Sequence, residues 1–192
     1  MSDNPIKLNL GCYNKKLPGF INVDIREDVN PDVVDNAFTL EKFDDNSVDL
    51  IYCCHMLEHL DYQEVNLALK RWYDVLKSKG ILRLSVPDMQ AVFSLYWYLD
   101  SNLDVLKTMI YGSQKHPFDY HKSGWDYFSI TYVLNKAGFR YIHEWDWFKT
   151  DPHKYCDDYS QIYYPKKSVE MKGGEVVKVE GKLMSLNVEA TK

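Results

Sequence analysis

The chain has 192 residues, of which 45% are apolar and 27% are charged, and its formal net charge is −5. This length suits one globular domain, and the acidic balance gives no bulk attraction for nucleic acid or for an anionic membrane. No apolar run reaches the roughly 18 residues that a membrane-spanning helix requires. The first residues lack the pattern of a signal peptide, and the four cysteines are most simply reduced thiols, so we expect a cytoplasmic protein.

Five apolar runs of strand length lie in the first half of the chain. Most are continuous rather than alternating, as expected for strands that are covered on both faces of a parallel sheet. The runs span residues 6–10, 20–25, 32–35, 48–54 and 81–87. Only residues 11–19 and 26–31 link the first three runs, and links of this length are too short for full crossover helices.

A helix is predicted between the fourth and fifth runs, over residues 63–80. Its apolar side chains follow the i, i+3, i+4, i+7 spacing of an amphipathic helix. They are Val65, Ala68, Leu69, Trp72, Val75 and Leu76. Lys77, Lys79 and Gly80 predict the end of this helix. Strand, helix and strand in this order indicate a crossover between parallel strands.

The second half of the chain is rich in aromatic residues, since 20 of the 28 lie between Phe93 and Tyr164. A larger core with amphipathic surface side chains would explain this enrichment, and a platform for a substrate is the alternative. Residues 149–174 lack a regular pattern and predict an irregular surface excursion. The remaining predicted elements are helices over 88–100, 102–110 and 127–138, strands over 139–145 and 182–190, and a hairpin turn at Glu180-Gly181.

Three segments resemble the class I S-adenosylmethionine-dependent methyltransferases, most of all their short members associated with surface-polysaccharide biosynthesis. The segments are LNLGCYNKKLPGFINVDI (8–25), DNAFTLEKFDDNSVDLIYCCHMLEHL (35–60) and LKSKGILRLSVPD (76–88). The resemblance implies a single α/β domain over residues 1–192 with a Rossmann-like methyltransferase fold. We expect a mostly parallel seven-stranded sheet, a C-terminal antiparallel hairpin strand and shortened early helices. Residues 1–90 would bind the cofactor, and the aromatic-rich residues 91–192 would bind the acceptor.

The resemblance also implies which residues bind S-adenosylmethionine and its product S-adenosylhomocysteine. Gly11 opens the loop after the first strand, where the backbone would approach the methionine part of the cofactor. Tyr13 stands where similar proteins carry a second glycine. Asp24 closes the second strand and would accept hydrogen bonds from both ribose hydroxyls. The expected cofactor-binding residues are Leu10, Gly11, Cys12, Tyr13, Asp24, Asp35, Asn36, Cys54 and His55.

Asp35 and Asn36 follow the third strand. In similar proteins these positions face the amino group and ring nitrogens of adenine, and a side-chain acceptor with a backbone donor would suit that edge. An Asx turn is the alternative explanation for both residues.

The segment YCCHMLEHL (52–60) contains the H-x-x-E-H pattern of one zinc peptidase group. That pattern needs both histidines on one helical face, whereas here a strand leads directly into His55. Cys53 and Cys54 point to opposite faces of the sheet, and no second His/Cys cluster supplies further ligands. We therefore predict no metal site. Glu58 and His59 are expected to begin the next helix, with Glu58 at its positive N-terminus.

Methyl transfer from a sulfonium is an in-line displacement, so alignment of the acceptor with the methyl group supplies most of the rate. An acceptor hydroxyl or ammonium group must still lose a proton, and a histidine is the natural base. His55 and His121 are the predicted catalytic residues, and His116 is a further candidate. Asp119 could orient His121. A polar loop with helix caps is the alternative explanation for residues 116–126.

The leading hypothesis is a methyltransferase that acts on a small or glycan-linked acceptor. A catalytically inactive methyltransferase-like binding or assembly subunit is the second hypothesis, because Tyr13 and the short link 11–19 depart from the usual pattern. A metal-dependent hydrolase that uses His55, Glu58 and His59 is the third. The missing early helices leave one face of the sheet with little cover, so either the aromatic tail or a second copy in a homodimer would cover it.

Overall fold

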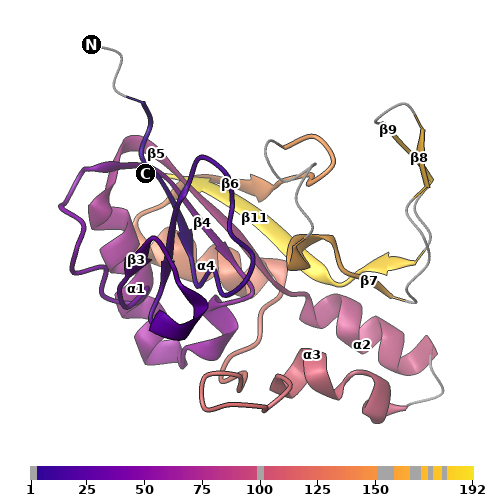
Figure 1. The fold of residues 1–192 in the computed structure, drawn as a ribbon. Coiled ribbons are helices and arrows are strands. Elements are labelled where there is room, and N and C mark those ends of the chain that lie inside the picture. Colours follow the sequence, from indigo (N-terminus) through magenta and orange to yellow (C-terminus); the bar gives the residue numbers. More distant parts are fainter. Residues whose placement is uncertain (1–3, 99–101, 151–157, 165–169, 173–174, 179–180) are drawn as a thin grey trace.

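The computed structural model describes residues 4–98, 102–150, 158–164, 170–172, 175–178 and 181–192. Its centre is a seven-stranded sheet in the order β3-β2-β1-β4-β5-β11-β6 (Figure 1). The strands are β1 (Lys7–Leu10), β2 (Ile21–Asp24), β3 (Val33–Val34), β4 (Val48–Cys54), β5 (Leu76–Pro87), β6 (Arg140–Glu144) and β11 (Ser185–Thr191). β11 is antiparallel to both of its neighbours, whereas the pairs among the first five strands are parallel. The predicted Rossmann-like sheet with a C-terminal antiparallel strand is confirmed.

The first two links contain no α-helix, as predicted. Turns join β1 to β2, and the 3-10 helix η1 (Glu27–Val29) lies between β2 and β3. Polar side chains tie this corner together. Asn9 Nδ2 donates to Asn22 Oδ1 at 2.9 Å, and Asn22 Nδ2 donates to Asp32 Oδ2 at 2.7 Å. These hydrogen bonds fix the path of the chain between the strands, in place of the crossover helix that usually joins parallel strands.

Helix α1 (Tyr62–Val75) connects β4 to β5 and begins at a capping box. The Asp61 side chain accepts a hydrogen bond from Glu64 N, and the Glu64 side chain accepts one from Asp61 N, each at 2.9 Å. The 3-10 helix η2 (Leu57–His59) precedes it. The prediction that Glu58 and His59 begin the long helix is therefore wrong, because the N-cap signal belongs to Asp61.

The end of α1 also differs from the prediction. The helix stops at Val75, and residues 76–80 already belong to β5. Lys79, rather than Gly80, has the positive φ, at 67°. Lys79 N donates to Lys192 O at 3.1 Å, and Lys192 N donates to Gly80 O at 3.0 Å. These tertiary hydrogen bonds to the end of β11 override the local helix-stop signal.

Helices α1 and α4 (Tyr127–Ala137) cover one face of the sheet with the main hydrophobic core (Figure 1). Trp72 is fully buried in this core, and its Nε1 donates to Ala37 O at 2.7 Å. Successive side chains of β4 point to opposite faces of the sheet, so Cys53 belongs to the helix-covered core and Cys54 packs on the other face. This places the two cysteines on opposite faces, as predicted.

A second apolar cluster covers the opposite face. It consists of Leu17, Phe20, Tyr52, Trp145 and Trp147. The segment after β6 thus folds back over the sheet beside β4 and the first link. In this chain the aromatic tail supplies cover that the missing early helices leave out.

The rest of the second half forms short elements. Helix α2 (Met89–Tyr98), the 3-10 helix η3 (Leu103–Val105) and α3 (Lys107–Tyr111) lie beyond the end of β5 (Figure 1). The helix predicted over 102–110 is divided, because the Asn102 side chain caps a separate 3-10 turn at Asp104 N. Among the described residues, no helix is long and apolar enough to cross a membrane.

Three described elements lie within the predicted irregular excursion 149–174. They are η5 (Tyr159–Gln161), β7 (Tyr163–Tyr164) and β8 (Glu170–Lys172). The predicted final strand is divided into β10 (Lys182–Leu183), which pairs with β7, and β11. β9 (Glu175–Lys178) pairs with β8. Residues 151–157, 165–169, 173–174 and Glu180 of the predicted hairpin turn lie outside the described residues.

We expect Trp72→Phe to lower the free energy of unfolding by roughly 2–4 kcal/mol, because it removes buried volume and leaves the Ala37 carbonyl without its donor. Urea denaturation measures the change. Tyr132→Phe is the control, since Tyr132 is 63% exposed on α4 and its change should stay within about 0.5 kcal/mol. Equal losses in the two variants would contradict a stabilising role of the Trp72 hydrogen bond.

Candidate functional site

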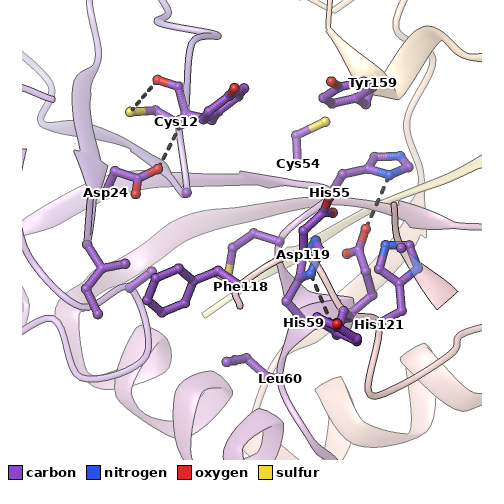
Figure 2. A pocket seen from close by; sticks show the side chains of 18 of the residues that line it. Cys12, Asp24, Cys54, His55, His59, Leu60, Phe118, Asp119, His121 and Tyr159 are labelled. Carbon is purple, nitrogen blue, oxygen red and sulfur yellow. Dashed lines mark hydrogen bonds and ion pairs between the residues drawn. The ribbon is translucent and has the colours of Figure 1, made fainter. Parts of the chain in front are cut away.

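A cavity of about 690 Å³ opens at the carboxyl ends of β1, β2 and β4. Its walls combine residues from both halves of the chain, including Gly11 and Asp24 from the first half and Phe118 and His121 from the second. Asp24 and His121 lie at opposite ends of the group of side chains in Figure 2. The volume lies within the range of about 300–1,000 Å³ that small-molecule pockets occupy. This edge is also where open α/β sheets bind ligands.

The loop after β1 forms the first wall. Gly11 has a φ of +64°, and a Cβ atom at this position would lie 2.5 Å from Met56 Cγ. Tyr13 also adopts a left-handed backbone, with a φ of 41°. Its side chain is 44% exposed and lies beside the Arg26 guanidinium, 5.4 Å from the ring centroid. Tyr13 therefore keeps a backbone conformation that glycine adopts most readily.

Asp24 holds the loops on both sides of the β2 terminus. Its Oδ2 accepts a hydrogen bond from Tyr13 N at 2.8 Å (Figure 2). Its Oδ1 accepts one from Arg26 N at 2.9 Å. The residue is 7% exposed and lines the cavity. Each carboxylate oxygen has two acceptor sites, so both oxygens keep capacity for a ligand hydroxyl.

The loop after β3 brings only part of the predicted set to the cavity. Asn36 lines it, whereas Asp35 and Leu10 are not among its lining residues. The Asp35 carboxylate accepts hydrogen bonds from Asn36 N at 2.8 Å and Lys42 N at 3.0 Å. Asn36 Oδ1 accepts from Phe38 N at 2.9 Å, which is the Asx turn weighed from the sequence. Asp35 thus shapes the loop from behind.

The cavity cysteines are held as protonated thiols. Burial, together with the nearby Asp24 carboxylate, raises the pKa of Cys12 to about 11. Burial raises the pKa of Cys54 well above its ordinary value. Both residues line the cavity, so they supply its walls with neutral, polarisable groups.

His55 follows β4 directly, as predicted, and its backbone has a φ of 49°. Its Nδ1 lies 3.3 Å from Glu58 Oε1 (Figure 2). Its Nε2 lies 2.8 Å from Ser185 Oγ. The Ser185 hydroxyl donates to Tyr159 O at 2.5 Å, so it accepts the His55 Nε2 proton. Both ring nitrogens of His55 are therefore engaged within the protein.

Glu58 is the most buried charged group of the site, at 1% exposure. Apart from the 3.3 Å approach of His55 Nδ1 to Oε1, its carboxylate oxygens have no hydrogen-bond partner among the described residues. Burial alone would raise its pKa, but the neighbouring His55, His59 and His121 bring the pKa below its ordinary value. An ionised carboxylate in this position depends on the cationic or polar groups around it.

The segment after α3 docks on the η2 turn. Lys122 N and Ser123 N both donate to Glu58 O, at 2.8 and 3.1 Å. With these two hydrogen bonds in place, the His59 and His121 rings lie edge to face, with their centroids 4.8 Å apart. Glu58, His59 and His121 each offer a ligand atom, and these atoms lie within 4.8 Å of one another.

His121 is oriented differently from the prediction. Its Nδ1 lies 3.0 Å from Met109 O, whereas the Asp119 carboxylate accepts a hydrogen bond from Ser113 Oγ. The prediction that Asp119 orients His121 is therefore wrong, because a backbone carbonyl fills that role. Burial lowers the pKa of His121, although the Glu58 carboxylate opposes this. The further candidate His116 lines the cavity, and its Nε2 lies 3.4 Å from Arg26 Nη1.

The contact between Glu58 and His121 was missed from the sequence. Both YCCHMLEHL and HPFDYHKSGWD carry several chemically active residues, which was the available signal. Their pairing is set by hydrogen bonds between segments about sixty positions apart. Local spacing carries no information on such a contact.

Residues 18–84 match the family model of a methyltransferase domain. Comparison with curated proteins gives no match. The matched range includes Asp24 and continues to β5, so it contains much of the cavity wall from the first half. The part of the chain that lines the cavity beside Asp24 is therefore similar to a methyltransferase domain.

Several solved structures share the fold. A methyltransferase from Archaeoglobus fulgidus has 16% identity and a TM-score of 0.58, with 99% of this chain and 87% of that chain covered. One from Thermotoga maritima has 16% identity and a TM-score of 0.59, with 97% and 82% covered. One from Methanosarcina mazei has 16% identity and a TM-score of 0.58, with 100% and 94% covered. All three are described as S-adenosylmethionine-dependent methyltransferases, and at this identity the likeness concerns the fold.

We expect Gly112→Ala to destabilise the protein more than Gly19→Ala. Both glycines have a φ of +77°, so the backbone cost of a side chain is similar. A Cβ atom at position 112 would lie 2.3 Å from the backbone oxygen of Asp119, whereas nothing lies within 4 Å at position 19. Gly112 therefore allows the close turn that leads to His121.

Thermal melts of the two variants measure the difference. We expect the Gly112→Ala loss to exceed that of Gly19→Ala by about 1–3 kcal/mol, the usual cost of forcing extra atoms into a packed site. Equal melting temperatures would show that the 112–121 segment relaxes freely and does not hold His121.

Proposed function

We propose that this chain, which has the methyltransferase fold, is an S-adenosylmethionine-dependent methyltransferase acting on a small or glycan-linked acceptor. The observation that carries the proposal is the buried Asp24 carboxylate at the carboxyl end of β2, inside a cavity of about 690 Å³. A carboxylate at this position suits the two ribose hydroxyls of a nucleoside cofactor.

The cofactor would lie along the first wall of the cavity. Gly11, Cys12 and Tyr13 would contact its methionine part, and Asp24 its ribose. Asn36 would face the adenine, with Leu10 and Asp35 supporting the two loops from behind. Cys54 and His55 would form the floor near the sulfonium, where neutral thiol and engaged imidazole groups present no competing nucleophile.

The acceptor would enter beside residues 116–122, which line the cavity from the second half of the chain and include His121. We call these residues the second wall. In the reaction a bond forms between the acceptor atom and the methyl carbon while the carbon–sulfur bond breaks, leaving S-adenosylhomocysteine. Because both nitrogens of His55 are engaged, we place activation of the acceptor at His121. Its Nδ1 faces the Met109 carbonyl, so its Nε2 carries an unused lone pair. His55 instead positions Glu58.

Aromatic groups from the second half of the chain support a sugar-like acceptor. Phe118, Tyr120 and Tyr159 line the cavity, and such rings suit the apolar face of a sugar or another flat amphipathic group. This favours an acceptor from surface-polysaccharide biosynthesis. The free thiols of Cys12 and Cys53 suit a reducing compartment, in line with a cytoplasmic enzyme.

The first test is calorimetric titration with S-adenosylhomocysteine. We expect one-to-one binding that Asp24→Asn weakens at least tenfold, because hydrogen bonds to a charged group contribute about 1.5–3 kcal/mol. Asp28→Asn is the control, since Asp28 pairs with Arg26 on the surface and lies outside the cavity. It should bind with unchanged affinity.

Absence of binding at millimolar ligand would contradict the proposal and favour the non-catalytic binding subunit. Binding without release of S-adenosylhomocysteine from S-adenosylmethionine, across a panel of sugar and small hydroxylated acceptors, would contradict the acceptor class.

A further inference from the structure

We propose that Glu58, His59 and His121 form a binding site for a divalent transition-metal ion at the acceptor end of the cavity. Two histidines and one carboxylate are a donor set that zinc and its neighbours in the first transition row bind in proteins. All three residues line the cavity, so an ion held by them would keep a position open to a small molecule. The sequence alone predicts no metal site, because the third ligand, His121, lies in a segment distant from Glu58 and His59 along the chain.

The hydrogen bonds of both histidines suit metal binding. His59 Nδ1 lies 3.2 Å from Tyr120 O, and His121 Nδ1 lies 3.0 Å from Met109 O. A carbonyl oxygen only accepts, so in each ring Nδ1 carries the proton and Nε2 carries the lone pair. Metal-binding histidines are usually oriented in this way by a backbone carbonyl or a carboxylate.

Glu58 supplies an independent observation that points to a cation. Its side chain is 1% exposed, and apart from His55 its carboxylate oxygens have no hydrogen-bond partner among the described residues. His55 Nδ1 lies 3.3 Å from Oε1 and is its neighbour within the protein. Oε2 has no such partner in the described part of the chain, and a buried carboxylate oxygen without a partner is costly. A bound cation would supply it.

The three ligand atoms lie within 4.8 Å of one another. With bonds of about 2.1 Å to a tetrahedral ion, they would approach to roughly 3.4 Å. Binding therefore requires these ligand atoms to move closer together by roughly 1.4 Å at most. The backbone is held by the hydrogen bonds from Lys122 N and Ser123 N to Glu58 O.

The catalytic consequence rests on the proposed function. A metal-bound hydroxyl group of the acceptor would become more acidic, as metal-bound water does. The acceptor oxygen would lose its proton to solvent and form the bond to the methyl carbon as the carbon–sulfur bond breaks. His121 would then activate the acceptor as a ligand of the ion. This assigns the acceptor to the oxygen nucleophiles.

The test is calorimetric titration of the chelator-treated protein, without a polyhistidine tag, with Zn²⁺ alone. We expect saturable binding of one ion, which His59→Asn and His121→Asn each weaken at least tenfold. His143→Asn is the matched control, because His143 is an exposed histidine on β6 and should leave the affinity unchanged. Titration with Co²⁺ should give visible absorption bands that the His59 and His121 variants lose.

No saturable Zn²⁺ binding, or unchanged binding in the His59→Asn/His121→Asn double variant, would overturn the metal site. Unchanged melting of the variants before metal addition separates ligand loss from misfolding. The Zn²⁺ titration uses no cofactor, so its result is independent of S-adenosylhomocysteine binding. Zinc binding without S-adenosylhomocysteine binding would support the metal site and overturn the proposed methyltransferase function. S-adenosylhomocysteine binding without zinc binding would support the methyltransferase function and overturn the metal site.

Discussion

The hydrogen bonds of the Asp24 carboxylate are the constraint on which the cavity depends. In this fold a crossover helix after the first strand would normally fix the loop that faces the ligand, and its N-terminus would supply backbone donors. Here the links after β1 and β2 are too short for such a helix. The carboxylate joins Tyr13 N and Arg26 N instead, so one side chain sets the geometry of two loops. The residue that suits the ribose is also the residue that builds the wall.

The second half of the chain completes the architecture in two different ways. Trp145 and Trp147 pack with Tyr52 on the sheet face that lacks early helices. The segment that ends at Ser123 reaches around the carboxyl edge and is fastened to the Glu58 carbonyl. Cover of the sheet and closure of the cavity thus come from one aromatic-rich region. This gives its composition a structural explanation beside any contact with an acceptor.

The sequence predicted the elements that depend on local pattern. Continuous apolar runs located the strands, and the spacing around Trp72 located α1. Where distant contacts decide, local signals failed: the hydrogen bonds of Lys192 end α1 before Gly80, and the Met109 carbonyl orients His121 in place of Asp119. The same limit applies to the site, because Asp24 can be found at a strand end, whereas a pairing of Glu58 with His121 needs the folded chain.

The left-handed backbone of Tyr13 links the loop to any ligand of Asp24, because both would use the same carboxylate group. Holding a residue with a side chain in this region costs of order 1–3 kcal/mol, and the hydrogen bond from Tyr13 N to Asp24 helps to offset it. A ribose hydroxyl that binds Asp24 changes the strength of that bond. Binding and loop conformation are therefore thermodynamically linked, and by reciprocity any substitution that relaxes residue 13 also alters the affinity at Asp24. A glycine at this position would weaken this link, because its backbone adopts the left-handed conformation without strain.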